Sequence, residues 1–182
     1  MRAMRGTQIS LVDQIPVTIR RLSEKQVAQA FPLLRESGRC DSLASWKDYA
    51  LAFIADTPDS AWPSGITVAE QSNRCLVGLY SYVVRPCLRS GRVLSVGDLT
   101  VMTPFGKEVV AERLLDSVTQ LARTQRVNQL EIGLASATGW LAALLGKRGY
   151  SLDDRRQIVW RRSATDGVEE PAVVLAPASP RS

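Results

Sequence analysis

The chain contains no histidine among its 182 residues, and this absence excludes more chemistry than any other feature of the composition. Nucleophile activation in Ser-His-Asp and Cys-His sites, zinc ligation by imidazole and proton shuttling by histidine all need a side chain that is missing here. We therefore exclude these classes of enzyme.

Cysteines are few and apolar runs are short. Because Cys40, Cys75 and Cys87 are odd in number and form no C-x-x-C pair, we expect neither a disulfide framework nor a zinc site, and we predict reduced thiols. No apolar run approaches the roughly 20 residues that cross a bilayer, so no membrane span is expected. Arg2 and Arg5 are not followed by an apolar signal-peptide core, and we expect a cytoplasmic protein.

The composition is that of one globular domain, with 45% hydrophobic residues, 23% charged residues and a formal net charge of +5. The basic balance fits a polyanionic ligand such as a nucleotide cofactor, and equally a scattered solvated surface. Residues 1–16 are weakly patterned, and residues 163–182 are rich in proline without an aromatic side chain. We predict a flexible segment over 1–16, a folded domain over 17–162 and a disordered tail over 163–182.

Helices and strands alternate along this domain. Residues 17–22 alternate in polarity as a strand does, and Ser23 and Gln26 have the spacing of a capping box. A helix is expected over 24–36, with a kink or break near Phe31 because Pro32 follows. A second helix is expected over 43–55, with a core-facing stripe of Leu43, Trp46, Tyr49, Ala50 and Phe53.

Three strands follow, over 66–71, 76–84 and 93–102, and the first two form a hairpin around a polar turn. Gly97 and Asp98 inside the third strand predict a bulge. The clearest helix covers 107–125 and is capped by Thr103 or the following turn. Its apolar stripe comprises Val110, Leu114, Leu115, Val118, Leu121 and Ala122.

A strand over 130–135 and a helix over 137–147 come next. The helix ends at Gly149 and Tyr150, and a final strand covers 156–162. The order β-α-α-β-β-β-α-β-α-β predicts an α/β layer fold with a mixed sheet. The side chains expected to be buried in the last helix are Trp140, Leu141, Leu144 and Leu145.

This order and three local sequences resemble the GNAT superfamily of N-acetyltransferases over residues 17–162. Residues 97–101 (GDLTV) resemble the family's fourth strand, in which an acidic residue lies three positions before the valine that opens the cofactor loop. Residues 101–115 align without a gap with the acetyl-CoA motif, and residues 145–150 (LGKRGY) are similar to the end of the family's fourth helix. The resemblance implies a mixed, mostly antiparallel central sheet flanked by about four helices.

The resemblance also implies a site for acetyl-CoA as acyl donor. The fourth strand offers backbone groups to the pantetheine arm, and the next helix aims its first N–H groups at the pyrophosphate. Gly106 replaces the usual Arg or Gln, Val109 the first glycine and Thr103 the leading proline, while Lys107 is a candidate replacement for the basic side chain. The alternative is the start of an amphipathic helix with no ligand. The implied cofactor residues are Leu99, Thr100, Val101, Thr103, Gly106, Lys107, Glu108, Val109, Val110 and Ala111.

Asp98 is the candidate catalytic residue. Acetyl transfer needs a neutral amine, stabilisation of the developing oxyanion and a proton for the leaving thiolate. Asp98 acts as a base, directly or through water, or it bonds backbone amides beside the bulge; both readings stay open. The position of the family's acid tyrosine is Leu145, which cannot donate a proton, and we expect Tyr150 to pack in the core.

Four other side chains have two readings. Glu70 and Glu131 on neighbouring predicted strands either add a second carboxylate to an acceptor site or lie on a solvated face. Cys75 and Cys87 are acyl-carrier candidates, but no activating cluster accompanies them, and direct transfer in a ternary complex is favoured.

We therefore expect an acyl-CoA-dependent N-acyltransferase that transfers acetyl from acetyl-CoA directly to a primary amine. The alternative is a catalytically silent GNAT-like domain that acts as an acyl-CoA sensor or a protein-interaction module. The expected partners are a CoA thioester and an amine, with no metal. Membrane and nucleic-acid binding are not expected because the matching patterns are missing. Association of two chains into a homodimer stays open.

Overall fold

The protein is described from a computed structural model, which places residues 16–56, 60–133, 139–153 and 159–163. The predicted terminal segments, 1–16 and 163–182, lie outside these ranges except for Pro16 and Ser163. The elements in chain order are β1 (Val17–Arg21), the short 3₁₀ helix η2 (Glu24–Gln26), α1 (Val27–Glu36), α2 (Leu43–Ala55), β2 (Ser64–Gln71), β3 (Leu76–Cys87), β4 (Gly91–Val101), α3 (Lys107–Thr124), β5 (Gln129–Gly133), α4 (Gly139–Lys147), β6 (Ser151–Asp153) and β7 (Val159–Ser163).

The strands form one seven-stranded sheet in the order β1-β2-β3-β4-β5-β7-β6. Every neighbouring pair is antiparallel except β4 and β5, which α3 connects in parallel. The predicted α/β fold with a mixed, mostly antiparallel sheet and four α-helices is therefore confirmed.

The predicted order is incomplete at the C-terminal end. It lacks β6, which has three residues and is too short for alternation of polar and apolar residues to reveal it. The last strand begins at Val159, and residues 156–158 of the predicted strand lie outside the described residues. The strands predicted in the first half of the chain are confirmed, with β2 and β3 joined as a hairpin.

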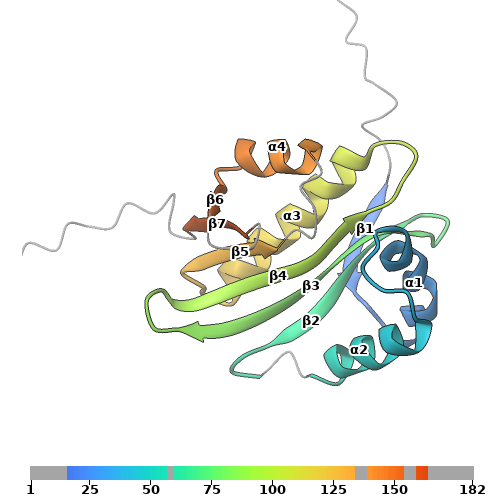
Figure 1. The fold of residues 1–182 in the computed structure, drawn as a ribbon, viewed down its shortest axis with the longest axis horizontal. Coiled ribbons are helices and arrows are strands. Elements are labelled where there is room, and N and C mark those ends of the chain that lie inside the picture. Colours follow the sequence, from blue (N-terminus) through green and yellow to red (C-terminus); the bar gives the residue numbers. More distant parts are fainter. Residues whose placement is uncertain (1–15, 57–59, 134–138, 154–158, 164–182) are drawn as a thin grey trace, which may run out of the picture.

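The helices cover the sheet on both faces, with α1 and α2 on one and α3 on the other (Figure 1). Two buried apolar clusters correspond to these two faces. The first joins α3 and α4 to the sheet through residues such as Val110, Leu114, Leu145, Val84 and Ile132. The second joins α1 and α2 to it through Leu33, Leu34, Trp46, Ile66 and Val68.

Of the kink or break predicted near Phe31, the break does not occur. A 3₁₀ turn over Glu24–Gln26 leads into α1, which continues through Pro32 to Glu36. Proline removes the hydrogen bond to the carbonyl of Ala28, four residues earlier. Both residues are exposed, so water can replace that bond without interrupting the helix.

The predicted core stripe of α2 is correct in part. Trp46 and Ala50 are buried, and the indole Nε1 of Trp46 donates a 2.6 Å hydrogen bond to the carbonyl of Val27 in α1. Leu43 and Tyr49 are 38% and 40% exposed, so the prediction is wrong at these two positions. The narrow buried face leaves Tyr49 directed into a pocket, as described below.

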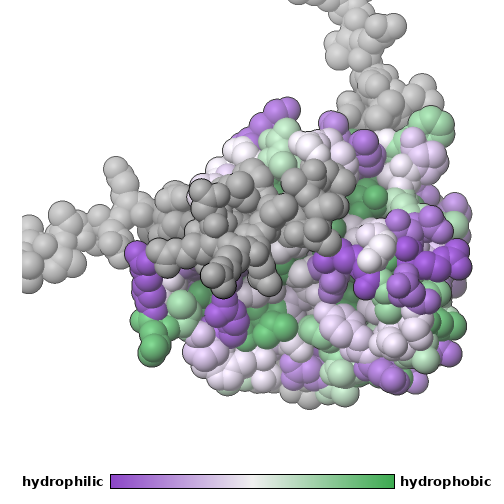
Figure 2. Space-filling model, viewed as in Figure 1, coloured by the Kyte–Doolittle hydropathy of each residue, from purple (hydrophilic) through white to green (hydrophobic). Residues whose placement is uncertain are grey.

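Among the described residues, no helix is long and apolar enough to cross a membrane. On the side shown in Figure 2, apolar surface is interspersed with polar surface. Two apolar side chains project strongly into solvent, Leu88 at the turn between β3 and β4 and Phe105 before α3. They lie in different loops and do not define a common surface.

Candidate functional site

A bulge in β4 creates the unusual geometry of the site. Ser81 of β3 pairs with Gly97, whereas Leu79 pairs with Thr100, so Asp98 and Leu99 together oppose a single residue of β3. Asp98 has φ 52°, in the left-handed region that few residues other than glycine adopt. The bulge predicted from Gly97 and Asp98 is confirmed, and it lies at a position where strain commonly accompanies function.

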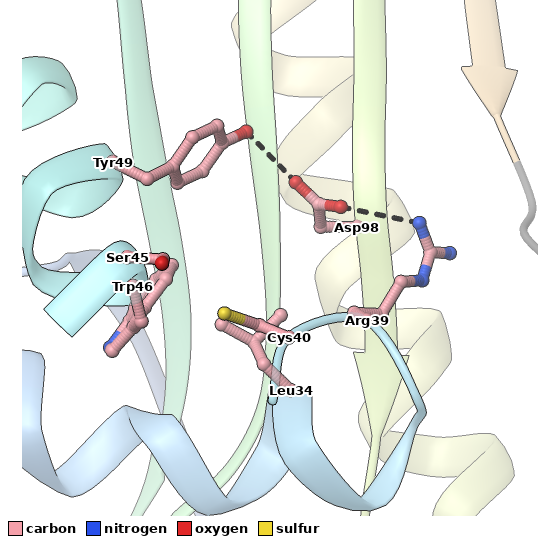
Figure 3. A pocket seen from close by; sticks show the side chains of 7 residues that line it. All are labelled: Leu34, Arg39, Cys40, Ser45, Trp46, Tyr49 and Asp98. Atoms are coloured by element: carbon pink, nitrogen blue, oxygen red, sulfur yellow. Dashed lines mark hydrogen bonds and ion pairs between the residues drawn. The ribbon is translucent and has the colours of Figure 1, made fainter. Parts of the chain in front are cut away.

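The Asp98 carboxylate joins three other parts of the chain, and Figure 3 shows two of its partners, Tyr49 and Arg39. Its Oδ2 accepts hydrogen bonds from the Tyr49 hydroxyl of α2 at 2.9 Å and from the Ser81 hydroxyl of β3 at 2.7 Å. Its Oδ1 lies 3.2 Å from Nη1 of Arg39, in the loop between α1 and α2. The observed partners of Asp98 are therefore side chains of α2, of β3 and of the loop between α1 and α2, whereas the sequence suggested backbone amides as an alternative.

Tyr49 is held in its protonated form. Burial raises its pKa to about 12, and the neighbouring Asp98 carboxylate adds to the shift, while the Ser81 hydrogen bond opposes it. A neutral hydroxyl thus lies against Asp98 across the physiological pH range.

Two pockets meet at Tyr49 and Asp98. The first has a volume of about 300 Å³ and lies between α1, α2 and the bulge, where Arg39, Cys40 and Trp46 contribute to its wall. The second has a volume of about 350 Å³ and extends from the bulge along β4 and β5. Asp98 and Tyr49 line both pockets, so a ligand in either pocket has access to the same carboxylate and hydroxyl.

Glu131 lines the second pocket together with Asp98. Its side chain is only 12% exposed, and its Oε2 accepts hydrogen bonds from Arg85 at 2.6 Å and Ser95 at 3.2 Å. The solvated-face reading of Glu131 is therefore wrong. Glu70 is also buried, but it bonds Arg20 and Gln26 near β1 and lines neither pocket.

The second pocket begins beside the last residues at which β4 and β5 pair. β4 and β5 pair only from Val93 with Gln129 to Val96 with Ile132. In the part of the chain that the structure describes, the rest of β4, through Asp98 to Val101, pairs with β3 alone. This edge of β4 therefore faces away from β3 with backbone groups that β5 does not bond.

The start of α3 follows β4 after a short loop. Its N-cap is Gly106, with φ 66°, and the N–H of Val110 bonds the Gly106 carbonyl at 3.1 Å. The Thr103 hydroxyl donates to the carbonyl of Phe105 at 2.8 Å, so Thr103 does not cap the helix and the following turn does. The N–H groups of the first turn, from Lys107 to Val109, have no acceptor inside the helix and are available to an anion.

The predicted cofactor residues form one continuous segment with very different exposures. Lys107 and Glu108 are exposed, and the ammonium group of Lys107 lies 5.1 Å from the centre of the Trp140 ring in α4. Trp140 is half-buried against the core, and not fully buried as predicted. Four of the predicted cofactor residues are half-buried, namely Val101, Thr103, Gly106 and Val109. Four others are buried, namely Leu99, Thr100, Val110 and Ala111.

The two positions compared with the family's fourth helix both lie in the core. Leu145 is fully buried, and Tyr150 is 4% exposed in the same apolar cluster. The expectation that Tyr150 packs in the core is confirmed. Gly149, with φ 80°, ends the helix, and the N–H of Tyr150 bonds the carbonyl of Leu145 at 3.1 Å.

The cysteines are free thiols, as predicted. Cys75 is exposed in the turn after β2, and Cys87 ends β3, seven residues from the position opposite the bulge. Hydrogen bonds from the backbone of Ser90 and Arg89 lower the pKa of Cys87, but its strand position separates it from Asp98 by roughly 20 Å. Cys40 is the thiol that lines a pocket with Asp98.

Sequence reasoning missed the side chains that bond the two carboxylates. Arg39, Tyr49 and Ser81 bond Asp98, and Arg85 and Ser95 bond Glu131. Tyr49 alone carried a signal, because a phenolic hydroxyl on an apolar stripe needs a partner. Among the residues that the structure places, no three His, Cys, Asp or Glu side chains form a group suited to a metal ion.

Sequence comparison finds no matching family model and no matching curated protein. Several solved structures nevertheless match the fold. The PaiA N-acetyltransferase of Thermoplasma acidophilum, solved with coenzyme A, has a TM-score of 0.61 and 14% identity, with 81% of this chain and 99% of that chain covered. A GNAT family acetyltransferase of Staphylococcus aureus has a TM-score of 0.64 and 11% identity, covering 82% and 99%. A GNAT family acetyltransferase of Elizabethkingia anophelis with bound acetyl-CoA has a TM-score of 0.56 and 16% identity, covering 81% and 97%.

These likenesses show that the chain has the GNAT fold, in agreement with the resemblance of its local sequences. At such low identity they show the fold alone. Activity and ligands have to be argued from the residues of this chain.

Proposed function

We propose that the protein is an acyl-CoA-dependent N-acyltransferase that transfers acetyl from acetyl-CoA directly to a primary amine. The observation that carries this proposal is the meeting of three features at Asp98: the end of β4–β5 pairing, the strained bulge and the two pockets. An edge of β4 that β5 does not pair, beside a carboxylate held by hydrogen bonds, suits a site where an extended thioester and an amine approach each other.

The acyl donor is assigned to β4 and the start of α3. The edge of β4 at Leu99, Thr100 and Val101 offers backbone groups to an extended pantetheine arm, because β5 does not bond it there. The first turn of α3 offers N–H groups and the positive end of the helix dipole to a pyrophosphate, and Lys107 adds a positive charge. The donor supplies an activated acetyl group in the form of a thioester.

The chemistry needs one bond to form and one to break. The amine nitrogen bonds to the carbonyl carbon, the carbon–sulfur bond breaks, the nitrogen loses a proton and the thiolate gains one. We assign the uptake of the amine proton to Asp98, directly or through water. Leu145, at the position of the family's acid tyrosine, has no hydroxyl group. Tyr49 contributes a protonated hydroxyl to the site.

The test is release of free CoA from acetyl-CoA in the presence of a panel of primary amines. We expect steady release with at least one amine, and we expect Asp98→Asn to lower turnover at least tenfold while the melting temperature is retained. Asparagine tolerates the left-handed backbone of this position, so the substitution removes the charge without adding strain. The matched control is Asp116→Asn. This substitution removes a carboxylate of α3 that pairs with Arg148, the residue after α4.

A catalytically silent acyl-CoA sensor is the second candidate. It is favoured by Leu145, which is fully buried and has no proton to donate. Tight binding of acetyl-CoA without release of CoA under any amine would support the sensor and contradict the enzyme. An Asp98→Asn variant with wild-type turnover would contradict the catalytic assignment of Asp98 alone.

A further inference from the structure

The wall of the second pocket combines aromatic rings with carboxylates. Tyr49 and Phe53 lie one turn apart on α2, and their ring centres are 4.7 Å apart at a tilted angle. Both rings line the pocket, and Tyr82 of β3 lies in the same wall. The volume of about 350 Å³ is at the lower end of the range for small-molecule sites, so the pocket suits a compact ligand.

The charged side chains that line this pocket are two carboxylates, Asp98 and Glu131, and one guanidinium, Arg85. The side chains of Asp98 and Glu131 are 26% and 12% exposed, and that of Arg85 is 46% exposed. Arg39, which is 18% exposed, pairs with Asp98 but lines the first pocket and not the second. The lining of the second pocket therefore carries one negative charge in excess, which favours a cation over an anion.

Hydrogen bonds fix both carboxylates in place. The Oδ2 of Asp98 accepts from Tyr49 and Ser81 and its Oδ1 from Arg39, and each carboxylate oxygen has about two lone-pair positions, so Oδ1 has capacity for one further donor. Arg39 approaches Oδ1 from the first pocket and does not line the second one. An ammonium group in the second pocket can therefore contact Asp98 without displacing Arg39.

We infer that the second pocket binds the acceptor as a primary ammonium group carried on a compact aromatic group, with the ammonium group at Asp98 and Glu131 and the ring against Tyr49 and Phe53. That this ligand is the acetyl acceptor rests on the proposed function. The chemistry of the ligand is inferred from the pocket itself. Aromatic walls bury the ring, and the carboxylates select the cation over neutral, anionic and zwitterionic compounds of the same size. Tyr49, Phe53, Asp98 and Glu131 are then the residues that determine acceptor specificity.

The test is direct binding of four ligands to the wild-type full chain, by calorimetry without acetyl-CoA. The ligands are 2-phenylethylamine, 2-phenylethanol, 3-phenylpropionate and phenylalanine, which share a ring and differ in charge. We expect 2-phenylethylamine to bind at least ten times more tightly than each of the others. Equal or tighter binding of the propionate or of phenylalanine overturns the inference, as does absence of amine binding.

Three variants locate the binding on the assigned residues. Asp98→Asn and Glu131→Gln should each weaken 2-phenylethylamine binding at least fivefold, whereas Asp116→Asn, on the far face of the sheet, should leave it unchanged. Phe53→Leu should lower the ratio of affinities for 2-phenylethylamine and n-butylamine at least threefold. Unchanged amine affinity in both carboxylate variants contradicts the assignment.

The two proposals fail in distinguishable ways. If amine binding depends on the carboxylates but the chain does not bind acetyl-CoA, the inferred ligand class is supported and the proposed acyltransferase activity is contradicted. If amines without an aromatic group are acetylated as fast as 2-phenylethylamine is, the acyltransferase activity is supported and the inferred aromatic specificity is contradicted. The wild-type ligand series decides the inference even where a variant fails to fold.

Discussion

At Asp98, one backbone angle decides where a carboxylate points. Successive residues of an ordinary strand direct their side chains to opposite faces of the sheet. At Asp98 the left-handed φ of 52° and the extra residue of the bulge change this orientation. The sequence predicted the bulge because glycine and aspartate interrupt an otherwise apolar strand. It did not predict Arg39 and Tyr49 as partners, because their positions depend on how α1 and α2 pack on the sheet.

The raised pKa of Tyr49 predicts a loss of stability at high pH. Below pH 10 tyrosine is protonated in both the folded and the unfolded chain, so the contribution of Tyr49 is fully present. From pH 10 towards 12 the unfolded chain loses this proton while the folded chain keeps it, and the free energy of unfolding falls. Tyr49→Phe should therefore lose less stability than the wild type over this interval, as measured by urea unfolding. Equal losses in both proteins would contradict the assigned environment.

The start of α3 shows how an element can be predicted while the roles of its residues are not. Its apolar periodicity extends over five turns, and the predicted helix agrees with Lys107–Thr124 almost to the residue. Ala111, which was predicted as a cofactor residue and not as part of the apolar stripe, is fully enclosed in the core. A glutamate at Ala111 would therefore disrupt the core before it could report on a ligand, so the anion site has to be tested at an exposed residue.

Lys107 provides that test. Lys107→Glu reverses an exposed charge in the first turn of α3, and an acidic residue at this end of a helix does not weaken the helix. We expect the dissociation constant for acetyl-CoA to rise at least tenfold, about 1.4 kcal/mol, in calorimetric titration. Lys47→Glu, an exposed charge reversal on α2, is the matched control and should bind as the wild type does. Equal affinity of the two variants would remove the pyrophosphate assignment.

The end of α2 is hydrogen-bonded to the sheet by Arg21 and by the Asp56 carboxylate, which accepts from the backbone N–H and the hydroxyl of Ser64. Arg21 of β1 donates hydrogen bonds through Nη2 to the carbonyls of Phe53 at 3.0 Å, Asp56 at 2.7 Å and Ser64 at 3.2 Å. These bonds attach the C-terminal end of α2, and with it Tyr49 and Phe53, to the sheet.

Arg21→Met retains most of the apolar stem and removes the donors. We expect a loss of about 1–3 kcal/mol in the free energy of unfolding, measured as a lower urea midpoint, because the carbonyls lose their partner. Arg35→Met is the control, since Arg35 and Glu36 form an ion pair with side chains 59% and 54% exposed, and little change is expected there. Equal midpoints for the two variants would show that Arg21 does not hold α2.

For the whole molecule, the order of elements predicted an α/β fold with a mixed sheet, because long periodic segments and turn residues specify element type and sequence order limits the topology. The GNAT fold was predicted from this order together with three local sequences. The end of the pairing between β4 and β5 at Val96 could not be predicted from the residues alone, because strand pairing is a non-local property that residues 97–101 do not encode by themselves. The same holds for the two pockets. The first combines α1, the loop that follows it, α2 and β4, and the second combines α2, β3, β4 and β5.

The central claim is that this fold holds an acyl-CoA at β4 and α3, and the melting temperature with and without millimolar acetyl-CoA tests it most directly. A ligand at 100 times its dissociation constant stabilises the folded chain by about 2.7 kcal/mol, which for a chain of this size raises the melting temperature by roughly 5–10 °C. We predict such a rise with acetyl-CoA and none with free adenosine at the same concentration. No rise with acetyl-CoA, or an equal rise with adenosine, would contradict the account.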